Sequence, residues 1–128
     1  MKKIIFIHSL IDDSQKPNIK MSDALASFFI NSLPKEILRE FEVSSLSENL
    51  KYGGVPRGYD AYLIHPQDVN IKDIRELKRE QPNSLFYCLH RWKENAKEEE
   101  REAYDYFTFM VDTEDLNKIA RQIRGEND

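Results

Sequence analysis

The chain has 128 residues, enough for one domain with a substantial core, and its 40% hydrophobic and 11% aromatic content is typical of a folded protein. It carries 19 Lys and Arg residues against 23 Asp and Glu residues, a formal charge of -4. Both signs are mixed along most of the chain and no basic face stands out, so we expect no nucleic-acid partner. No stretch approaches the ~20 apolar residues that cross a bilayer, and the apolar run after Lys3 is too short for a signal peptide. We therefore expect a cytoplasmic protein without membrane contact.

Apolar runs alternate with helical patterns along the chain. Continuous runs rich in β-branched and aromatic residues predict buried strands, and a looser alternation predicts a weaker one. The predicted strands cover residues 4–7, 41–46, 59–64, 85–89 and 107–111. The run 85–89 is apolar throughout, which predicts an interior strand, and its Cys88 is predicted to be a small buried core residue.

Helices are predicted between the strands and after the last one. The predicted N-caps are Ser22, Asn70 and either Asp112 or Thr113. The residues predicted to face inward are Leu25, Phe28, Phe29 and Leu33 in the first helix, Ile71, Ile74 and Leu77 in a middle helix, and Leu116, Ile119, Ala120 and Ile123 in the last. Gly125 is predicted to end the last helix. Residues 95–103 form the least regular helix, and its acidic run 98–100 is predicted to be solvated.

Strands that alternate with helices predict a three-layer α/β domain spanning residues 1–128. The expected architecture is a doubly wound, five-stranded parallel sheet with right-handed crossovers and the strand order 2-1-3-4-5. In that order the first, third and fourth strands are neighbours. A ligand would bind at their carboxyl ends, beside the switch point between the first and third strands. We expect no output domain in this chain.

All three histidines directly follow a predicted strand: His8, His65 and His90. Parallel strands end at one edge of a sheet, so we expect the imidazoles to gather there, with carboxylates on the adjoining loops. Those carboxylates are Asp12, Asp13, Asp68 and Asp112. Such a set could bind zinc or another late first-row metal and activate a water molecule. The ligands show no close-spaced motif, so a metal site, a ligand-contacting or pH-sensitive polar edge, and unrelated strand-end histidines all stay open.

Three further features lie outside the predicted strands, two of them at this edge. The loop from Ser9 to residue 17 is long for a βα connection, which suggests a lid or docking surface, and its lack of glycine argues against a phosphate-cradling loop. Ser9 follows His8, but adjacent strand residues point to opposite faces, which disfavours a serine–histidine dyad.

Trp92 is predicted to emerge at the carboxyl edge, where it could stack on a flat ligand or a partner, or be partly buried under a loop. Arg57, in a glycine-rich turn, could hold an anion, although that turn lies at the amino-terminal end of the third strand.

Residues 59–64 (YDAYLI) resemble the third strand of the receiver domains of bacterial response regulators. In that family the next residue is the phosphate-accepting aspartate, and here it is His65. Residues 105–116 (DYFTFMVDTEDL) are similar to the last strand and last helix of the family, with Phe109 in place of a lysine. The family's acidic metal-binding pair aligns with His8 and Ser9, and its hydroxyl residue after the fourth strand aligns near Leu89 or His90.

The resemblance implies a degenerate receiver, in which every position that carries phosphotransfer is altered. Magnesium prefers oxygen ligands, and here imidazole and hydroxyl groups would replace two carboxylates. The implied function is a non-catalytic regulatory or protein-interaction domain that requires no cofactor. Receivers commonly pair through the surface around the fourth helix and the last strand and helix, which here would include Trp92, Tyr104 and Tyr106. We therefore expect a protein partner, with a homodimer as a further option.

The competing hypothesis is a flavodoxin-like or TIR-like protein that uses the same edge. It would bind a small molecule or nucleotide, or act as a metal-dependent hydrolase, through His8, His65 and His90. Under this hypothesis the ligand-binding residues are the same as above: His8, Ser9, Asp12, Asp13, His65, Asp68, His90 and Trp92.

Overall fold

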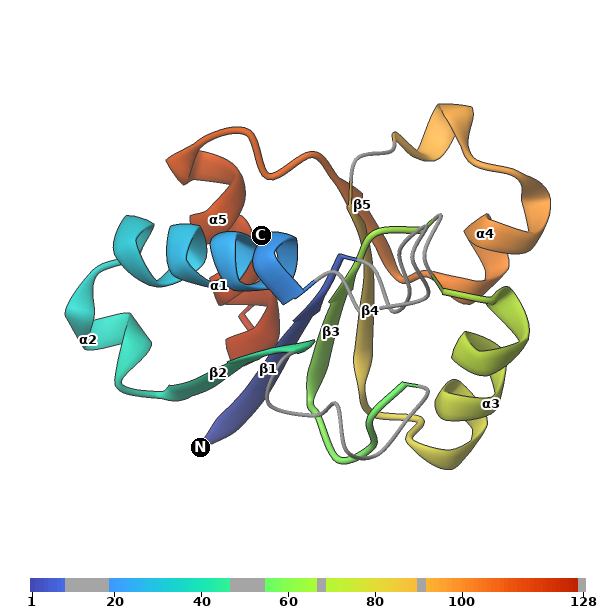
Figure 1. Cartoon of the computed structure of the whole chain (residues 1–128), viewed down its shortest axis with the longest axis horizontal. Coiled ribbons are helices and arrows are strands. Elements are labelled where there is room, and N and C mark those ends of the chain that lie inside the picture. The colour runs from blue at the N-terminus through green and yellow to red at the C-terminus, as the bar shows by residue number, and fades with distance from the viewer. Residues whose placement is uncertain (9–18, 47–54, 67–68, 90–91, 127–128) are drawn as a thin grey trace.

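The computed structural model describes residues 1–8, 19–46, 55–66, 69–89 and 92–126. These residues form a five-stranded sheet in the order β2-β1-β3-β4-β5, in which every neighbouring pair is parallel (Figure 1). The strands are β1 (Lys2–Ile7), β2 (Phe41–Ser45), β3 (Ala61–Ile64), β4 (Leu85–Leu89) and β5 (Tyr106–Thr108). The predicted fold class and strand order are confirmed.

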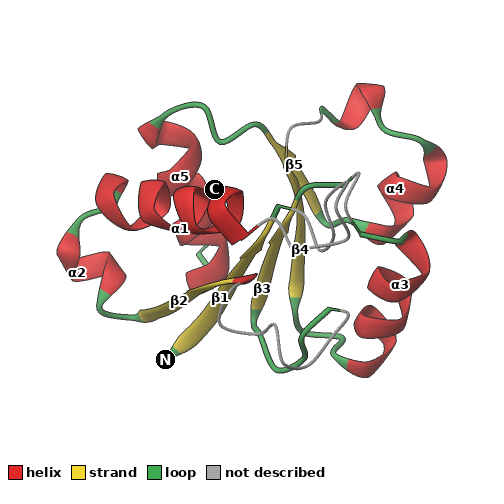
Figure 2. Ribbon diagram, viewed as in Figure 1, coloured by secondary structure: helices red, strands yellow, loops and turns green. Residues whose placement is uncertain are grey.

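Helices cover both faces of the sheet (Figure 2). The helices are α1 (Ile19–Ser32), α2 (Lys35–Leu38), α3 (Ile71–Glu80), α4 (Glu98–Ala103) and α5 (Thr113–Arg124), with a 3₁₀ turn, η2, at Lys93–Asn95. Residues of α1, α2 and α5 pack on one face, and residues of α3 and α4 pack on the other. No helix in this part of the chain is long and apolar enough to cross a membrane.

The central strands are apolar on both sides because each side faces a layer of helices. Along β1, Ile4 and Phe6 belong to the α1/α5 core, while Ile5 and Ile7 belong to the α3/α4 core. All four of these side chains are fully buried. Cys88 is likewise buried in β4, as predicted. Continuous apolar runs in this sequence therefore mark interior strands.

The predicted caps at α3 and α5 are confirmed. The Asn70 side chain accepts a hydrogen bond of 2.9 Å from the backbone N–H of Lys72, and Asp112 accepts one of 3.0 Å from that of Asp115. Gly125 ends α5 with φ of 88°, a left-handed conformation that glycine adopts without a Cβ clash. These local interactions fix where each helix starts or stops.

The prediction for the start of α1 was wrong. The helix begins at Ile19, so Ser22 lies within it rather than capping it. Ser22 is fully buried, and its Oγ accepts a hydrogen bond of 3.0 Å from the backbone N–H of His8. Phe28, predicted to face inward, is 42% exposed, whereas the small residue Ala26 is buried. Small residues at positions 22 and 26 let α1 approach the sheet closely.

Two predictions near the C-terminus also need correction. The last strand covers Tyr106–Thr108 rather than residues 107–111, because Met110 has φ of 52° and turns the chain toward α5. Glu100, predicted to be solvated, is buried, and its carboxylate accepts a hydrogen bond of 3.1 Å from the backbone N–H of Lys97. That carboxylate therefore satisfies a backbone donor at the start of α4.

Candidate functional site

Two of the three histidines lie side by side at the carboxyl edge of the sheet. Ile7 of β1 pairs with Ile64 of β3, so the residues that follow them, His8 and His65, are neighbours. Their ring centroids are 4.6 Å apart and the rings are tilted by 33°. The backbone N–H of His65 donates to the carbonyl of Ile7 at 2.8 Å, which extends the ladder to this point. The imidazole pair thus stands at the switch point between β1 and β3.

Helix α1 anchors the pair through the backbone of His8. The buried Oγ of Ser22 holds the backbone of His8, and the Nδ1 atoms of both rings are shielded from solvent. Each histidine as a whole is only partly buried. Imidazole nitrogens can accept or donate a hydrogen bond or bind a transition metal. The pair itself therefore offers imidazole nitrogens as ligands.

Most of the other predicted edge residues lie outside the described residues. They are Ser9, Asp12, Asp13, Asp68 and His90. Within the described ranges no group of three His, Cys, Asp or Glu side chains is arranged to hold a metal ion. The three-histidine site consequently stays a prediction, of which the structure places only His8 and His65 together. Asp112 lies after β5 and caps α5.

A second feature lies beside β5, on the α5 side of the sheet. It is a small cleft of about 120 Å³, which we call the β5 cleft. The residues that line it are Tyr87, Trp92, Tyr106, Phe107, Thr108, Asp115, Lys118, Ile119 and Gln122. The rings of Tyr87 and Tyr106 stack at 4.9 Å, and the Tyr87 hydroxyl donates to Gln122 Oε1 at 2.9 Å. Sequence reasoning missed this cleft, because its walls come from two strands and from one face of α5.

Trp92 lies at the mouth of the β5 cleft. Its side chain is 50% exposed and contacts the ring of Phe109, with the ring centroids 4.5 Å apart. The sequence left open whether Trp92 would be exposed or partly buried under a loop, and in the structure the indole is half-exposed and contacts Phe109. Tyr104, predicted to lie on the same surface, is instead buried on the opposite face of the sheet, in the α3/α4 core.

On one side of β5, the backbone N–H and C=O groups face no other strand of the described sheet. Asp105 donates its N–H to the carbonyl of Phe86 at 2.8 Å, so Asp105 and Phe107 point their backbone groups toward β4. Backbone groups alternate along a parallel strand, and those of Tyr106 and Thr108 therefore point away from β4. In the sheet as described, β5 has only β4 as a neighbour. Edge strands of this kind can pair with another chain.

Arg57, which was considered as an anion-binding residue, is engaged within the chain. Its Nε contacts Glu80 Oε2 at 2.5 Å, and its Nη2 lies 3.9 Å from Glu76 Oε1. The hydrogen bond and positive charge of Arg57 lower the pKa of Glu80. The same contact raises the pKa of Arg57, so the guanidinium stays charged. Gly58, the next residue, has φ of 94°, a left-handed conformation that glycine adopts without a Cβ clash.

No family model and no curated protein matches the sequence. The structure is similar to the response regulator protein TrrA from Thermotoga maritima, solved in complex with Mg²⁺ and BeF, with a TM-score of 0.60 and 13% identity over 96% of this chain and 99% of that one. It is also similar to a CheY-like response regulator receiver domain from Methylobacillus flagellatus, with a TM-score of 0.54 and 21% identity over 96% of this chain and 99% of that one. The chain therefore has the fold of a response regulator receiver domain, as the sequence resemblance implied.

Proposed function

We propose that this chain is a non-catalytic regulatory domain that acts through protein contacts and accepts no phosphoryl group at the end of β3. The observation that carries this proposal is His65. An imidazole follows β3 directly and faces a second imidazole, His8, at a ring distance of 4.6 Å. The resemblance to receivers puts a phosphate-accepting aspartate at position 65, and an imidazole cannot form an acyl phosphate.

The positions around His65 support the same conclusion. His8 offers nitrogen where receivers use carboxylate oxygen for Mg²⁺, and Mg²⁺ favours oxygen ligands. Phe109, aligned with the lysine of the family, packs on Trp92 at 4.5 Å. At the aligned positions 8, 9, 65 and 109 this chain thus carries none of the carboxylate or lysine side chains that receivers use there. A domain of this fold without that chemistry is left with its surfaces as the means of signalling.

The β5 cleft is the surface that best fits a protein partner. An apolar cavity of ~150 Å³ holds a molecule the size of benzene, so a cleft of about 120 Å³ fits one apolar side chain. Tryptophan and tyrosine supply much of the binding energy in interfaces, and here Trp92 and Tyr106 form part of the wall. The outward backbone groups of β5 add hydrogen-bond partners next to the cleft.

Exposure to a phosphodonor tests the proposal. The full chain is incubated with acetyl phosphate and Mg²⁺, beside a receiver domain that has its aspartate, and the intact masses are compared. We expect the mass of a phosphoryl group on the control receiver and none on this chain. Stoichiometric phosphorylation of this chain, lost in His65→Ala, would show that the domain is phosphorylation-dependent and would refute the proposal.

A second function is favoured by one observation, the closeness of the two imidazoles. Zn²⁺ binds histidine nitrogen at ~2.0–2.1 Å, and two rings 4.6 Å apart can reach one ion after a small rotation. Equilibrium dialysis of untagged protein against Zn²⁺ tests this alternative. Near-stoichiometric zinc that is lost in both His8→Ala and His65→Ala would replace the regulatory proposal with a metal site.

A further inference from the structure

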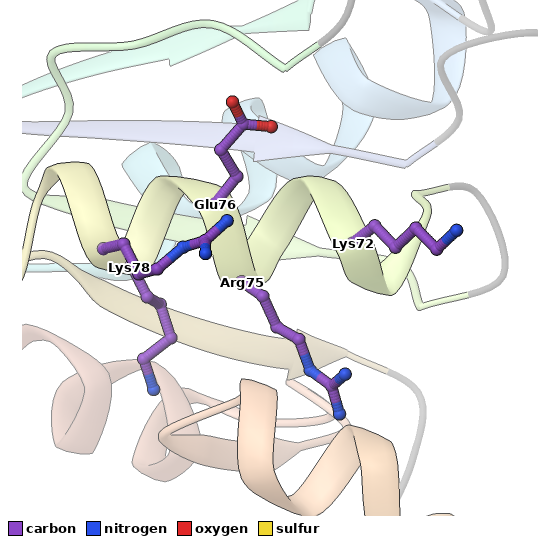
Figure 3. A pocket seen from close by; sticks show the side chains of 5 residues that line it. Lys72, Arg75, Glu76 and Lys78 are labelled. Atoms are coloured by element: carbon purple, nitrogen blue, oxygen red, sulfur yellow. The ribbon is translucent and has the colours of Figure 1, made fainter.

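The outer surface of α3 separates its charges into two lines. Residues 72, 75 and 79 are basic and residues 73, 76 and 80 are acidic, so each line follows the three- and four-residue spacing of one helix edge. In Figure 3, Glu76 points to the opposite side of the helix from Arg75 and Lys78. The basic line extends for ~10 Å along the helix axis.

The two lines differ in how far the chain itself neutralises them. Arg57 contacts Glu76 and Glu80 on the acidic line. On the basic side, Arg75 contacts Glu102 Oε2 at 3.3 Å. Among the described residues, Lys72 and Arg79 have no ion-pair partner. Lys72 and Arg79, at the two ends of the basic line, are therefore available to carboxylates that lie outside the described residues.

An acidic helix lies directly beside the basic line. Helix α4 packs against α3 on the same face of the sheet (Figure 1). Its Glu98, Glu99 and Glu102 are exposed, whereas Glu100 is buried. The surface formed by α3 and α4, which we call the α3/α4 face, thus carries a basic line next to three exposed glutamates. The one basic residue of α4, Arg101, is also exposed and donates to the backbone carbonyls of Lys93 and Glu94.

The α3/α4 face also has room for a neighbour. An open trough of about 580 Å³ runs over α3, lined by Lys72, Arg75, Glu76, Lys78 and Arg79. The side chain of Lys78 is only 30% exposed, since its Nζ reaches Asp105 Oδ1 at 3.0 Å. The aliphatic stems of such side chains provide apolar contact while their charged ends stay accessible.

We propose that the α3/α4 face is a homotypic contact, in which two copies of the chain pair around a two-fold axis. A two-fold contact uses the same surface on both copies, so that surface must complement itself. Here α4 of each copy would bring Glu98 and Glu99 to Lys72 and Arg79 of the other. A nucleic acid fits this face less well, because the acidic line of α3 and a formal charge of -4 would repel phosphates. The contact is separate from the β5 cleft, which lies on the α5 side of the sheet, and goes beyond the proposed function.

The expected contact is weak and depends on salt. Exposed ion pairs are individually weak, and two helices of 10 and 6 residues cover less than the ~800 Å² per partner of a standard interface. The Debye length is ~30 Å at 0.01 M salt and ~3 Å at 1 M. Self-association of the 15.2 kDa chain should therefore be measurable at low salt and disappear at high salt.

Charge reversal followed by sedimentation equilibrium tests the proposal. In variant K72E/R79E, α3 becomes acidic like the native α4. In variant E98K/E99K, α4 becomes basic like the basic line of the native α3. We expect each variant alone to associate at least about tenfold more weakly than the native chain at low salt. We expect their equimolar mixture to form a one-to-one heterodimer, because each α3 then meets an α4 of opposite charge. The neutral variant E98Q/E99Q, with its fold checked by circular dichroism, should show an intermediate loss.

Two controls make the result specific. K35E/R39E makes the same charge change on α2, which packs on the other face of the sheet, and should leave association unchanged. Trp92→Ala alters the β5 cleft and should also leave it unchanged. The proposal is overturned if the native chain stays monomeric at low salt, if the mixed variants do not associate, or if Trp92→Ala abolishes association while the charge variants do not. Binding of duplex DNA that K72E/R79E removes, without self-association, would equally overturn it.

Discussion

Strands β1 and β5 belong to one sheet but occupy opposite environments. Residues 4–7 of β1 are fully buried, and the strand has a neighbour on each side. The three residues of β5 are all only partly buried, and among the described residues the strand pairs with β4 alone. The comparison indicates that β1 contributes chiefly to stability, whereas β5 keeps aromatic rings and backbone groups accessible for contacts. Three substitutions test this division, and a fourth tests an exposed ion pair outside both strands.

The largest effect is expected from Phe6→Ala in β1. Phe6 is fully buried and contacts Phe29 of α1, with the ring centroids 5.4 Å apart. Removing a buried phenyl ring loses its burial and leaves a cavity, which costs ~3–5 kcal/mol. Urea denaturation followed by circular dichroism measures the loss. The matched control is Phe28→Ala on the exposed side of α1, and an equal loss there would contradict the burial assigned to the two rings.

A smaller effect is expected from Ser22→Ala, because Ser22 holds the backbone of His8, the residue that follows β1. The substitution removes the buried acceptor of the His8 N–H and leaves a backbone donor without that bond, at a cost of ~1–3 kcal/mol. NMR should also show a shift of the His8 amide resonance. The exposed Ser27 of the same helix provides the control, because Ser27→Ala should change the free energy of unfolding by less than ~0.5 kcal/mol. A loss at position 27 equal to that at 22 would rule out the anchoring role.

Trp92→Ala at the β5 cleft is expected to cost less than ~1 kcal/mol. Half of the indole is exposed, and its contact is with Phe109, itself only partly buried. Thermal unfolding of the variant beside the native chain provides the measurement. If Trp92→Ala destabilised the protein as much as Phe6→Ala, the tryptophan would be part of the core, and the contrast between β1 and β5 would fail.

The smallest effect is expected at the exposed ion pair of Arg57 and Glu80. Arg57 lowers the pKa of Glu80 in the folded state, so the carboxylate stabilises the fold above its unfolded pKa of ~4.3. That contribution is lost as the pH falls through the lowered folded pKa. The difference in melting temperature between the native chain and Glu80→Gln should therefore be present at pH 7 and vanish in acid. An unchanged difference at low pH would contradict this linkage, and Glu36→Gln on α2 serves as the control.

Much of the fold follows from the sequence because the strongest signals are local. Apolar runs mark the interior strands, and Asn70, Asp112 and Gly125 mark helix ends through single hydrogen bonds or one φ angle. The predicted start of α1 was wrong because Ser22 followed by Asp23 resembles the N-cap and first turn of a helix. The spacing of residues 22, 26, 29 and 33 is the helical signal that would have found the true inner face.

Part of the candidate site also follows from strand order. Once β1 and β3 are neighbours in a parallel sheet, His8 and His65 must meet, and the ring distance of 4.6 Å agrees. The β5 cleft could not be predicted, because it depends on how α5 packs against Tyr87. The charge lines of α3 could have been found in the sequence. Charges of both signs alternate along this helix, so the lines emerge only when residues three and four positions apart are grouped together.

The position of Trp92 has a practical consequence. It is the only tryptophan of the chain, so its emission comes from one place at the mouth of the β5 cleft. A molecule that covers the indole as it enters the cleft should shift this fluorescence to shorter wavelength. Unlabelled protein can therefore be screened optically for ligands of this cleft, with no reporter group added.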